Sequence, residues 1–223
     1  ENKKVHFIGL VSNGGVHSHI NHLKGLLTAA HEFGLNENVF VHAFTDGRDC
    51  DPLSGKGFIE ELQDHMEKTV GKLATVVGRY YAMDRDKRWE RVKLAYDAMV
   101  EGVGEQSTDA LASIQKSYDN HVTDEFIKPI IMIDSTQTGN VVPIAKITDQ
   151  DVVICFNFRT DRGREITEVL SQKDFPEFFM RKLPLYYVTL TNYDKTFQNV
   201  HVVFDELRTI LIFGIHQREN QQH

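Results

Sequence analysis

Short apolar runs rich in β-branched residues alternate along the chain with segments in which apolar residues recur every three or four positions. The first pattern is typical of buried strands and the second of amphipathic helices. Strands that alternate with helices in this way predict an α/β fold with a mostly parallel sheet and helices on both faces. The runs that predict strands lie at residues 5–11, 39–44, 74–81, 151–158 and 185–190, with a shorter candidate at 130–133.

The helical segments follow the predicted strands. Gly34 comes just after one apolar stripe, where a glycine commonly ends a helix. Two further helices are predicted at residues 89–100 and 109–118. We expect one domain at 1–215, followed by a polar, frayed tail at 216–223. The other helical stripes are Leu23, Leu26, Leu27 and Ala30, then Phe58, Ile59, Leu62 and Met66, and finally Ile166, Val169 and Leu170.

Composition narrows the possible functions. A chain of 223 residues with 41% hydrophobic content can bury a substantial core. Its net charge of −7 argues against a general nucleic-acid-binding protein, which would carry a basic excess. No apolar run approaches the ~20 residues that span a bilayer, so we expect no membrane partner. The two cysteines are too few for a disulfide framework and form no CxxC motif that would suggest zinc, so we expect a reducing, cytoplasmic compartment.

Candidate chemistry gathers in the loops that follow the predicted strands. The carboxyl ends of parallel strands share one edge of a sheet, and ligands of open α/β sheets bind there. The loops are therefore expected to form one pocket, in which five arginines surround a lone carboxylate and an imidazole. Such a pocket fits a ligand that carries both phosphate and carboxylate groups. The residues are His17 after the first strand, Arg48 and Asp49 after the second, Arg79 and Arg85 after the third, and Arg159 and Arg162 after the later one.

The arginines near the third strand can also be explained without a ligand. They can pair with the acidic residues of segment 84–90 on a solvated helix start. We prefer this interpretation for Arg88 and Arg91, which fall inside the helical pattern. Arg79 and Arg85 precede the helix in a loop, where binding residues are common, so we interpret both as functional.

The later pair, Arg159 and Arg162, lies where the next helix is predicted to begin. Both side chains can then reach one anion near the helix N-terminus, whose free N–H groups favour negative charge. The alternative is that Asp161 caps this helix and pairs with a neighbouring arginine. We expect the cap in either case, and it does not occupy both arginines.

Two aspartates flank a turn at residues 46–49. Asp46 is expected to accept hydrogen bonds from its own backbone turn. Asp49, beside Arg48, is expected to stay ionised in a cationic pocket, where it can accept a proton from a substrate hydroxyl. A second turn aspartate remains the alternative for Asp49.

Three histidines close to one another raise the possibility of a metal site. His19 and His22 can share a helix face, and His17 lies just before them. The sequence places no evident carboxylate as a third ligand, and the loop is rich in glycine, so we predict no metal site in this chain.

Four motifs together resemble the cofactor-independent phosphoglycerate mutases. They are LVSNGGVHSHINHL (10–23), FTDGRD (44–49), GRYYAMDRDKRWERV (78–92) and FNFRTDRGREI (156–166), and they occur in the order of the family. The similarity runs from about residue 5 to about residue 197 and covers one of the family's two domains, the inserted substrate-binding domain, often called the phosphotransferase domain. Asn13 stands where family members usually carry aspartate.

The resemblance implies roles for the loop residues. Asp49 matches the aspartate that contacts the glycerate hydroxyls and is a candidate general base. His17, rather than His19 or His22, matches a substrate contact. The resemblance also implies that the phosphoryl group lies towards Arg159 and Arg162. The glycerate then lies towards Arg48, Arg79 and Arg85.

Members of this family interconvert 3-phosphoglycerate and 2-phosphoglycerate in glycolysis and gluconeogenesis, through a phosphoserine intermediate. A separate alkaline-phosphatase-like domain supplies the serine and two metal ions, usually manganese. The chain contains no matching nucleophile segment and no DxxxHxxxH motif. The resemblance therefore implies an excised or truncated domain, monomeric and inactive as an isomerase by itself, with no cofactor of its own and the missing domain as its partner.

Two other function classes stay open. The chain can be a non-catalytic module that binds a phosphorylated sugar acid. It can also be a metal-dependent hydrolase built on the histidine cluster, which the missing third ligand disfavours.

Overall fold

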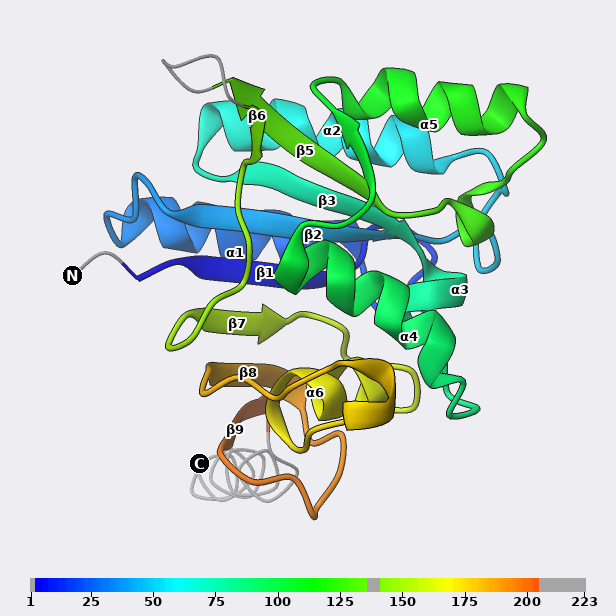
Figure 1. Ribbon diagram of the computed structural model, residues 1–223. Coiled ribbons are helices and arrows are strands. Elements are labelled where there is room, and N and C mark those ends of the chain that lie inside the picture. The colour runs from blue at the N-terminus through cyan, green and yellow to red at the C-terminus, as the bar shows by residue number, and fades with distance from the viewer. Residues whose placement is uncertain (1–2, 136–140, 205–223) are drawn as a thin grey trace, which may run out of the picture.

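The computed structural model describes residues 3–135 and 141–204, and within them nine strands form one sheet (Figure 1). The strands run in the order β4-β5-β3-β2-β1-β7-β8-β9, and β6 pairs with β5. Their bounds are β1 Val5–Leu10, β2 Val39–Thr45, β3 Lys72–Gly78, β4 Glu105–Ser107, β5 Ile130–Ser135, β6 Val141–Pro143, β7 Val152–Cys155, β8 Tyr186–Thr191 and β9 Val200–Phe204.

The predicted mostly parallel sheet is confirmed. The path from β3 through β2, β1, β7 and β8 to β9 is parallel throughout. Strand β5 runs antiparallel to β3, at the position of the short candidate strand. Strands β4, β6 and β9 were not predicted from the sequence. β4 and β6 have only three residues each, and most residues of β9 are not buried, so none gives a clear apolar signal.

Helices cover both faces of the sheet (Figure 1). On one face lie α1 (Ile20–Glu32), α2 (Gly55–Lys68) and α5 (Ala110–Asp119). On the other lie α4 (Trp89–Tyr96), its π-helical continuation η1 (Asp97–Glu101), and α6 (Arg164–Ser171). Successive residues of β1 pack on opposite faces of the sheet: Phe7 belongs to the core on the side of α1, α2 and α5, and Ile8 to the core on the side of α4 and α6. The short helices are α3 (Arg79–Ala82), η2 (Asp124–Phe126) and η3 (Pro176–Phe178).

The third strand is shorter than predicted. It ends at Gly78, and the next four residues form the helical turn α3 instead of continuing the strand. The backbones are in close contact at this point, where the Gly78 N–H donates to the Ile127 carbonyl at 2.7 Å. A Cβ atom at Gly78 would lie 2.4 Å from the Glu125 carbonyl oxygen, so only glycine fits here. This turn directs Arg79 into the protein rather than along the sheet.

The strand predicted at 151–158 is also shorter, since β7 ends at Cys155. The predicted tail at 216–223 lies outside the described residues, and the domain boundary at 215 stays a prediction. In the part of the chain that the structure describes, no helix is both long enough and apolar enough to cross a membrane.

A buried chain of polar side chains crosses the sheet from the amino end of β1 to the middle of β2 and β3. Nδ1 of His6 lies 2.9 Å from Nε2 of His42, and Nδ1 of His42 lies 2.9 Å from the Thr75 hydroxyl. Asp151 is 3.4 Å from Nε2 of His6. Burial lowers the pKa of both histidines, for His6 against the opposing pull of Asp151. Both imidazoles are therefore neutral at pH 7.

These imidazoles should make the fold sensitive to mild acid. Below pH 6.5, the ordinary histidine pKa, the unfolded chain binds protons that the folded chain does not. The free energy of unfolding should therefore fall with decreasing pH, by ~1.4 kcal/mol per pH unit for each such histidine. We expect urea denaturation between pH 7 and pH 5 to show a smaller pH dependence for His42→Gln than for the unmodified chain.

The matched control is His31→Gln, because His31 is an exposed residue of α1. It should keep the full pH dependence. Comparing slopes with pH, rather than absolute stabilities, separates proton uptake from packing lost by the substitution. An unchanged slope in His42→Gln would show that the buried imidazole takes no part in the acid response.

Candidate functional site

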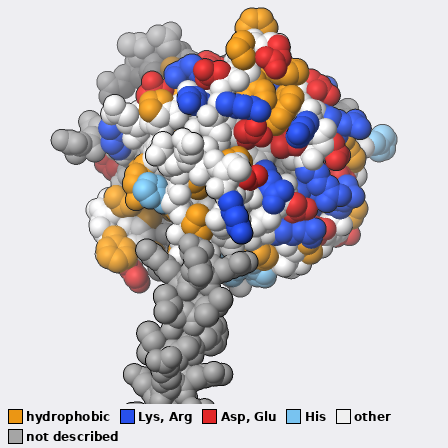
Figure 2. Space-filling view, turned by 90° about the horizontal axis from the view of Figure 1, so that it is seen from below, with side chains coloured by type: hydrophobic (Ala, Val, Ile, Leu, Met, Phe, Trp, Pro, Cys, Tyr) orange, Lys and Arg blue, Asp and Glu red, His pale blue; other side chains and the backbone are white. Residues whose placement is uncertain are grey.

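The sequence-predicted residues meet at the carboxyl edge of the parallel strands. Strand β1 is the switch point of the sheet, with β2 and β3 on one side and β7 and β8 on the other. The loops after β1 and β7 touch there, since the N–H groups of Phe158 and Arg159 approach the His17 carbonyl at 2.8 and 3.3 Å. Ligands of open α/β sheets bind at such a point. Lys and Arg side chains gather towards the right of Figure 2, the side on which β1 and β7 end in Figure 1.

Arg79 forms the buried centre of the site. Its side chain is only 2% exposed, and Nη1 lies 2.7 Å from Oδ1 of Asp46 and 2.6 Å from Oδ2 of Asp49. Burial by itself would lower the pKa of Arg79, but the hydrogen bonds to Asp49 and Asp46 raise it above its ordinary value. Arg79 is thus a permanent charge held between two carboxylates.

Asp46 has the predicted turn role and a second role that sequence reasoning missed. Oδ1 accepts the N–H groups of Arg48 and Asp49 at 3.1 and 3.0 Å, as expected for a turn aspartate. Oδ2 accepts the Ser12 hydroxyl at 2.7 Å. Burial would raise the pKa of Asp46, yet these hydrogen bonds and Arg79 lower it. The sequence of the turn does not indicate that the Asp46 carboxylate also binds an arginine from the helical turn after the next strand.

His17 lies between Asp49 and Asp161, two of the acidic residues of the site. Its side chain is buried, with Nε2 3.7 Å from Oδ2 of Asp49 and Nδ1 3.7 Å from Oδ1 of Asp161. Burial and then Arg79 lower the pKa of His17 to about 4, against the opposing effects of the two aspartates. A neutral imidazole can donate one proton and accept another, so His17 can bond both to a ligand and to a carboxylate. Asn13, earlier in the same loop, is exposed.

Asp161 links two arginines from distant segments. Its carboxylate lies 3.2 Å from Nη1 of Arg85 and 2.9 Å from Nε of Arg159. The predicted helix cap at Asp161 is wrong, because α6 begins at Arg164 with Gly163 as its N-cap. Arg159 and Arg162 therefore precede the helix in a turn, and Asp161 pairs with Arg159 and Arg85 instead of capping the helix. The pairing of Asp161 with a neighbouring arginine, which the sequence offered as an alternative, is present in the structure.

Arg162 and Arg48 complete the cluster. Nη1 of Arg162 donates to the Met83 carbonyl at 2.9 Å. Burial and then Arg79, Arg85 and Arg48 lower the pKa of Arg162, which shows that these cations crowd one another. Arg48 is exposed and lies 3.3 Å from Glu125.

All seven predicted residues thus come together, but the prediction of a single carboxylate in the pocket is wrong. The cluster contains four acidic groups around the five arginines. The sequence missed this because each additional acid comes from a different loop or is hidden in a turn. The four acids are Asp46, Asp49, Glu125 and Asp161.

Arg88 and Arg91 were assigned to a solvated helix start, and both contact the acidic residue Asp84, although Arg88 does so through its backbone. Nη1 of Arg91 lies 3.5 Å from Oδ1 of Asp84, which confirms the expected pairing, and its guanidinium stacks 3.9 Å from the centre of the Tyr80 ring. For Arg88 it is the backbone N–H that bonds Asp84, at 3.0 Å.

The two remaining histidines have structural contacts. His19 is the N-cap of α1, and its side chain accepts the Asn21 N–H at 3.1 Å. His22 packs edge-on against Phe158. Within residues 3–135 and 141–204, no group of three or more His, Cys, Asp or Glu side chains is placed to hold a metal ion. The described residues therefore do not fit a metal centre built on the histidines.

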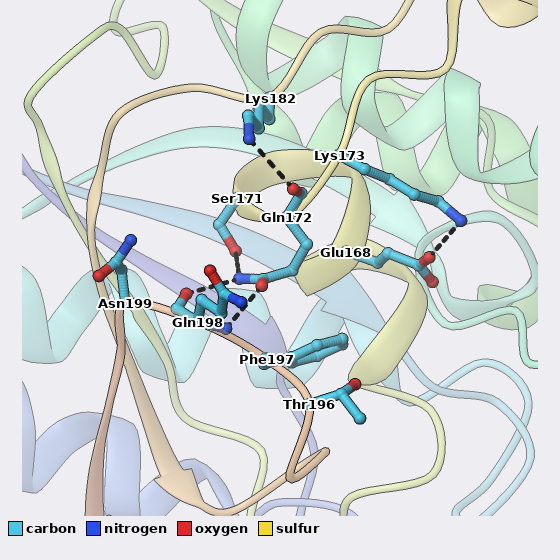
Figure 3. Close-up of a pocket in the computed structure, with 9 residues that line it drawn as sticks. All are labelled: Glu168, Ser171, Gln172, Lys173, Lys182, Thr196, Phe197, Gln198 and Asn199. Carbon is cyan, nitrogen blue, oxygen red and sulfur yellow. Dashed lines mark hydrogen bonds and ion pairs between the residues drawn. The ribbon is translucent and has the colours of Figure 1, made fainter.

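Two neighbouring cavities flank α6. One, of about 410 Å³, is lined by residues that include Arg85 and Asp161 and so adjoins the cluster. The other, of about 330 Å³, shares no residue with the cluster (Figure 3). Its side chains bond largely to one another: Lys173 pairs with Glu168 at 2.7 Å, and Gln172 bonds both Ser171 and Gln198. The cluster, not this second cavity, is the candidate site.

Comparison with known proteins identifies the family. The family profile described as "BPG-independent PGAM N-terminus" matches residues 1–195. The chain belongs to the 2,3-bisphosphoglycerate-independent phosphoglycerate mutase family. This confirms the resemblance seen in the four sequence motifs.

Curated relatives carry the same name. The 2,3-bisphosphoglycerate-independent phosphoglycerate mutase of Flavobacterium johnsoniae is 62% identical over 205 residues, which is 92% of this chain and 40% of the relative. The enzyme of that name from Clostridium perfringens is 52% identical over 204 residues, or 91% of this chain and 39% of the relative. The chain thus spans about 40% of the length of these mutases and corresponds to part of an isomerase.

A solved structure confirms the fold. The phosphoglycerate mutase of Leishmania mexicana, studied at low cobalt concentration, superposes with a TM-score of 0.79 at 32% identity. The match covers 87% of this chain and 36% of that one.

Proposed function

We propose that the chain binds 3-phosphoglycerate and 2-phosphoglycerate as the substrate-holding part of a glycolytic phosphoglycerate mutase. The observation that carries this proposal is the cluster of five arginines around a neutral His17 at the switch point of the sheet. The ligand's phosphate and carboxylate need several guanidinium forks, and arginine presents such forks in fixed planar geometry. Membership of the mutase family supports the same choice of ligand.

The charges of the cluster suit an anion that arrives from solvent. Arg48, Arg85 and Arg159 are each about half exposed, with side-chain exposures of 56%, 48% and 48%. Their ion pairs cost little to exchange, because exposed pairs contribute only ~0–1 kcal/mol. The phosphate and carboxylate groups of the ligand can therefore take over these forks, while buried Arg79 keeps its two aspartates. Binding also relieves the repulsion that the cations exert on Arg162.

Asp49 is the proposed proton acceptor. Its Oδ2 is held by Arg79, which fixes the carboxylate in the site. Among the described residues, Oδ1 of Asp49 has no hydrogen-bond partner, so it can accept a proton from a hydroxyl of the glycerate. Removing this proton as the hydroxyl attacks a phosphoryl group is general base catalysis, which contributes ~10²–10⁴-fold in rate.

The phosphoserine and the two metal ions, manganese by resemblance, are proposed to belong to the part of the longer relatives that this chain does not match. The described residues contain no group of three or more His, Cys, Asp or Glu side chains that would hold a metal ion. This chain's own contribution is to orient the glycerate towards the phosphoryl donor. Orientation of this kind can supply up to ~7–11 kcal/mol of the barrier. By the same resemblance we propose a cytoplasmic monomer, for which the free thiols of Cys50 and Cys155 are consistent with a reducing compartment.

Chemical-shift titration of the chain with 3-phosphoglycerate tests the proposal. We expect saturable shifts of the amides around His17, Asp49, Arg85 and Arg159, and the same set with 2-phosphoglycerate. Glycerate alone should bind more weakly because it lacks the dianion. Phosphorylated acids without the glycerate hydroxyl pattern should also bind more weakly.

Three outcomes would contradict parts of the proposal. Equal shifts for unrelated phosphorylated acids would favour a general phosphorylated sugar-acid binding module. A coupled assay with manganese measures turnover of 3-phosphoglycerate by this chain. Activity that co-purifies with the chain would show a catalytic group that the sequence did not reveal. Absence of any shift at millimolar ligand would reject substrate binding by this chain.

A further inference from the structure

A buried glutamate outside the arginine cluster holds the loop that carries Arg85. This Arg85 loop comprises residues 83–88, between α3 and α4. Oε1 of Glu165, on α6, accepts the N–H of Lys87 at 2.8 Å. Lys87 has φ of 58°, a left-handed conformation that residues other than glycine adopt rarely. The contact to Glu165 thus stabilises a backbone conformation that the loop would not favour by itself.

Asp84 holds the same loop from within. Its Oδ2 accepts the N–H groups of Asp86 and Arg88 at 2.9 and 3.0 Å. Its Oδ1 lies 3.5 Å from Arg91 on α4. Asp84 and Glu165 are both buried, at 4% and 6% exposure, so two carboxyl groups lie in one poorly solvated place at the base of the loop.

The second oxygen of Glu165 shows how this arrangement is stabilised. Oε2 is buried and has no hydrogen-bond partner among the described residues. An ionised carboxylate with an unsatisfied buried oxygen beside a second carboxylate is costly. A proton on Oε2 removes the charge and supplies a donor for Asp84, while Oε1 keeps the Lys87 N–H.

The surrounding charges favour this protonated form. Burial, then Asp84 and Glu168, raise the pKa of Glu165 to about 7, although the Lys87 N–H lowers it. The nearby cations have other partners: Arg164 donates to the Tyr193 carbonyl, Lys173 pairs with Glu168, and Arg85 pairs with Asp161. The charged groups that face Glu165 are Asp84, Arg85 and Lys87 from the loop, Arg164 and Glu168 from α6, Arg91 through Asp84, and Asp161, Lys173 and Asp194 around the adjoining cavity.

We propose that Glu165 is a positioning residue, which in its protonated form joins Asp84 to the Lys87 backbone and so places Arg85 in the substrate site. Ionisation of Glu165 places two negatively charged carboxylates side by side in a buried environment, and their repulsion loosens the Arg85 loop. The part of this inference that concerns substrate rests on the proposed function. The pH-dependent link between Glu165, Lys87 and Arg85 does not.

The ligand-free chain tests that link directly. Carboxyl ¹³C NMR should show Glu165 titrating near pH 7. The Lys87 amide and the Arg85 Nε–H signals should move with the same midpoint. In Glu165→Gln, whose amide donates and accepts as the protonated acid does, both reporter signals should stay constant between pH 6 and 8. Glu168→Gln, one turn further along α6, is the matched control: it should keep both titrations, with a midpoint that is lower because the Glu168 charge helps to raise the pKa of Glu165.

Substrate affinity provides the second measurement. If only the protonated form places Arg85, roughly a tenth of the chain is competent one pH unit above the pKa, and affinity falls by up to about tenfold. The phosphate of the ligand titrates in the same range, so the decisive quantity is the ratio of Kd for 3-phosphoglycerate between the unmodified chain and Glu165→Gln. This ratio should rise from near one at pH 6 to severalfold at pH 8.

The outcomes separate the two proposals. A Glu165 titration near pH 4.5, or Lys87 and Arg85 signals that ignore it, would overturn the positioning role whether or not substrate binds. Coupled ligand-free titrations with a constant Kd ratio would also overturn it, because Arg85 would then not be placed for the ligand. Coupled titrations with no binding of 3-phosphoglycerate at any pH would support the pH-dependent link and reject the proposed function.

Discussion

Replacing Arg79 by methionine should destabilise the chain by ~3–5 kcal/mol, the usual loss when one partner of a buried ion pair is removed. Methionine fills similar space but leaves Asp46, which is only 1% exposed, without its cation. The hydrogen bonds from Ser12 and the turn backbone remain, so the loss measures the missing charge. Urea denaturation at pH 7 gives the free energy of unfolding that checks this value.

Two further variants make the Arg79 experiment specific. Arg159→Met removes an arginine that is 48% exposed and should change stability by no more than ~1 kcal/mol. The double variant Arg79→Met, Asp46→Asn should recover part of the loss, since it removes the uncompensated charge as well. If Arg79→Met were as stable as Arg159→Met, the buried ion pair would not be the element that stabilises this edge of the sheet.

Replacing Arg162 by alanine should weaken binding of 3-phosphoglycerate by roughly ten- to a hundredfold and affect glycerate less. A charge-assisted contact to an ionised group is worth ~1.5–3 kcal/mol net, which sets this range. Arg85→Ala should weaken binding of both ligands, because by resemblance Arg85 lies towards the glycerate. Chemical-shift titration measures both affinities. Lysine at either position should restore binding only in part, because a point charge cannot reproduce the planar fork.

Arg181→Ala is the matched control for the binding experiment. Arg181 is exposed and pairs with Asp149 at 3.1 Å rather than with any residue of the cluster. It should leave both affinities unchanged. Equal losses for both ligands in the Arg85 and Arg162 variants would contradict the division between phosphate and glycerate. Arg85 and Arg159 share Asp161 in the ligand-free chain, so this division stays a prediction that only the titrations decide.

The fold class followed from local pattern. Apolar runs and helical stripes report which face of each element is buried, and that periodicity is set by backbone geometry alone. The strands that the pattern missed are short or exposed, so they carry little apolar signal. The antiparallel direction of β5 could not be predicted from the pattern either, because strand direction depends on how the chain returns to the sheet.

The sequence by itself determined the family, the parallel sheet and the loops that bring His17, Asp49 and the arginines to one edge. It did so because motif residues and periodicity are local properties of the chain. Only the tertiary structure decided which charges meet: Asp46 with Arg79, Asp161 with Arg85, and Glu165 with the Lys87 backbone. These partners lie 33, 76 and 78 positions apart in the chain. Their pairing depends on which loops the sheet order places side by side, and no local pattern records that order.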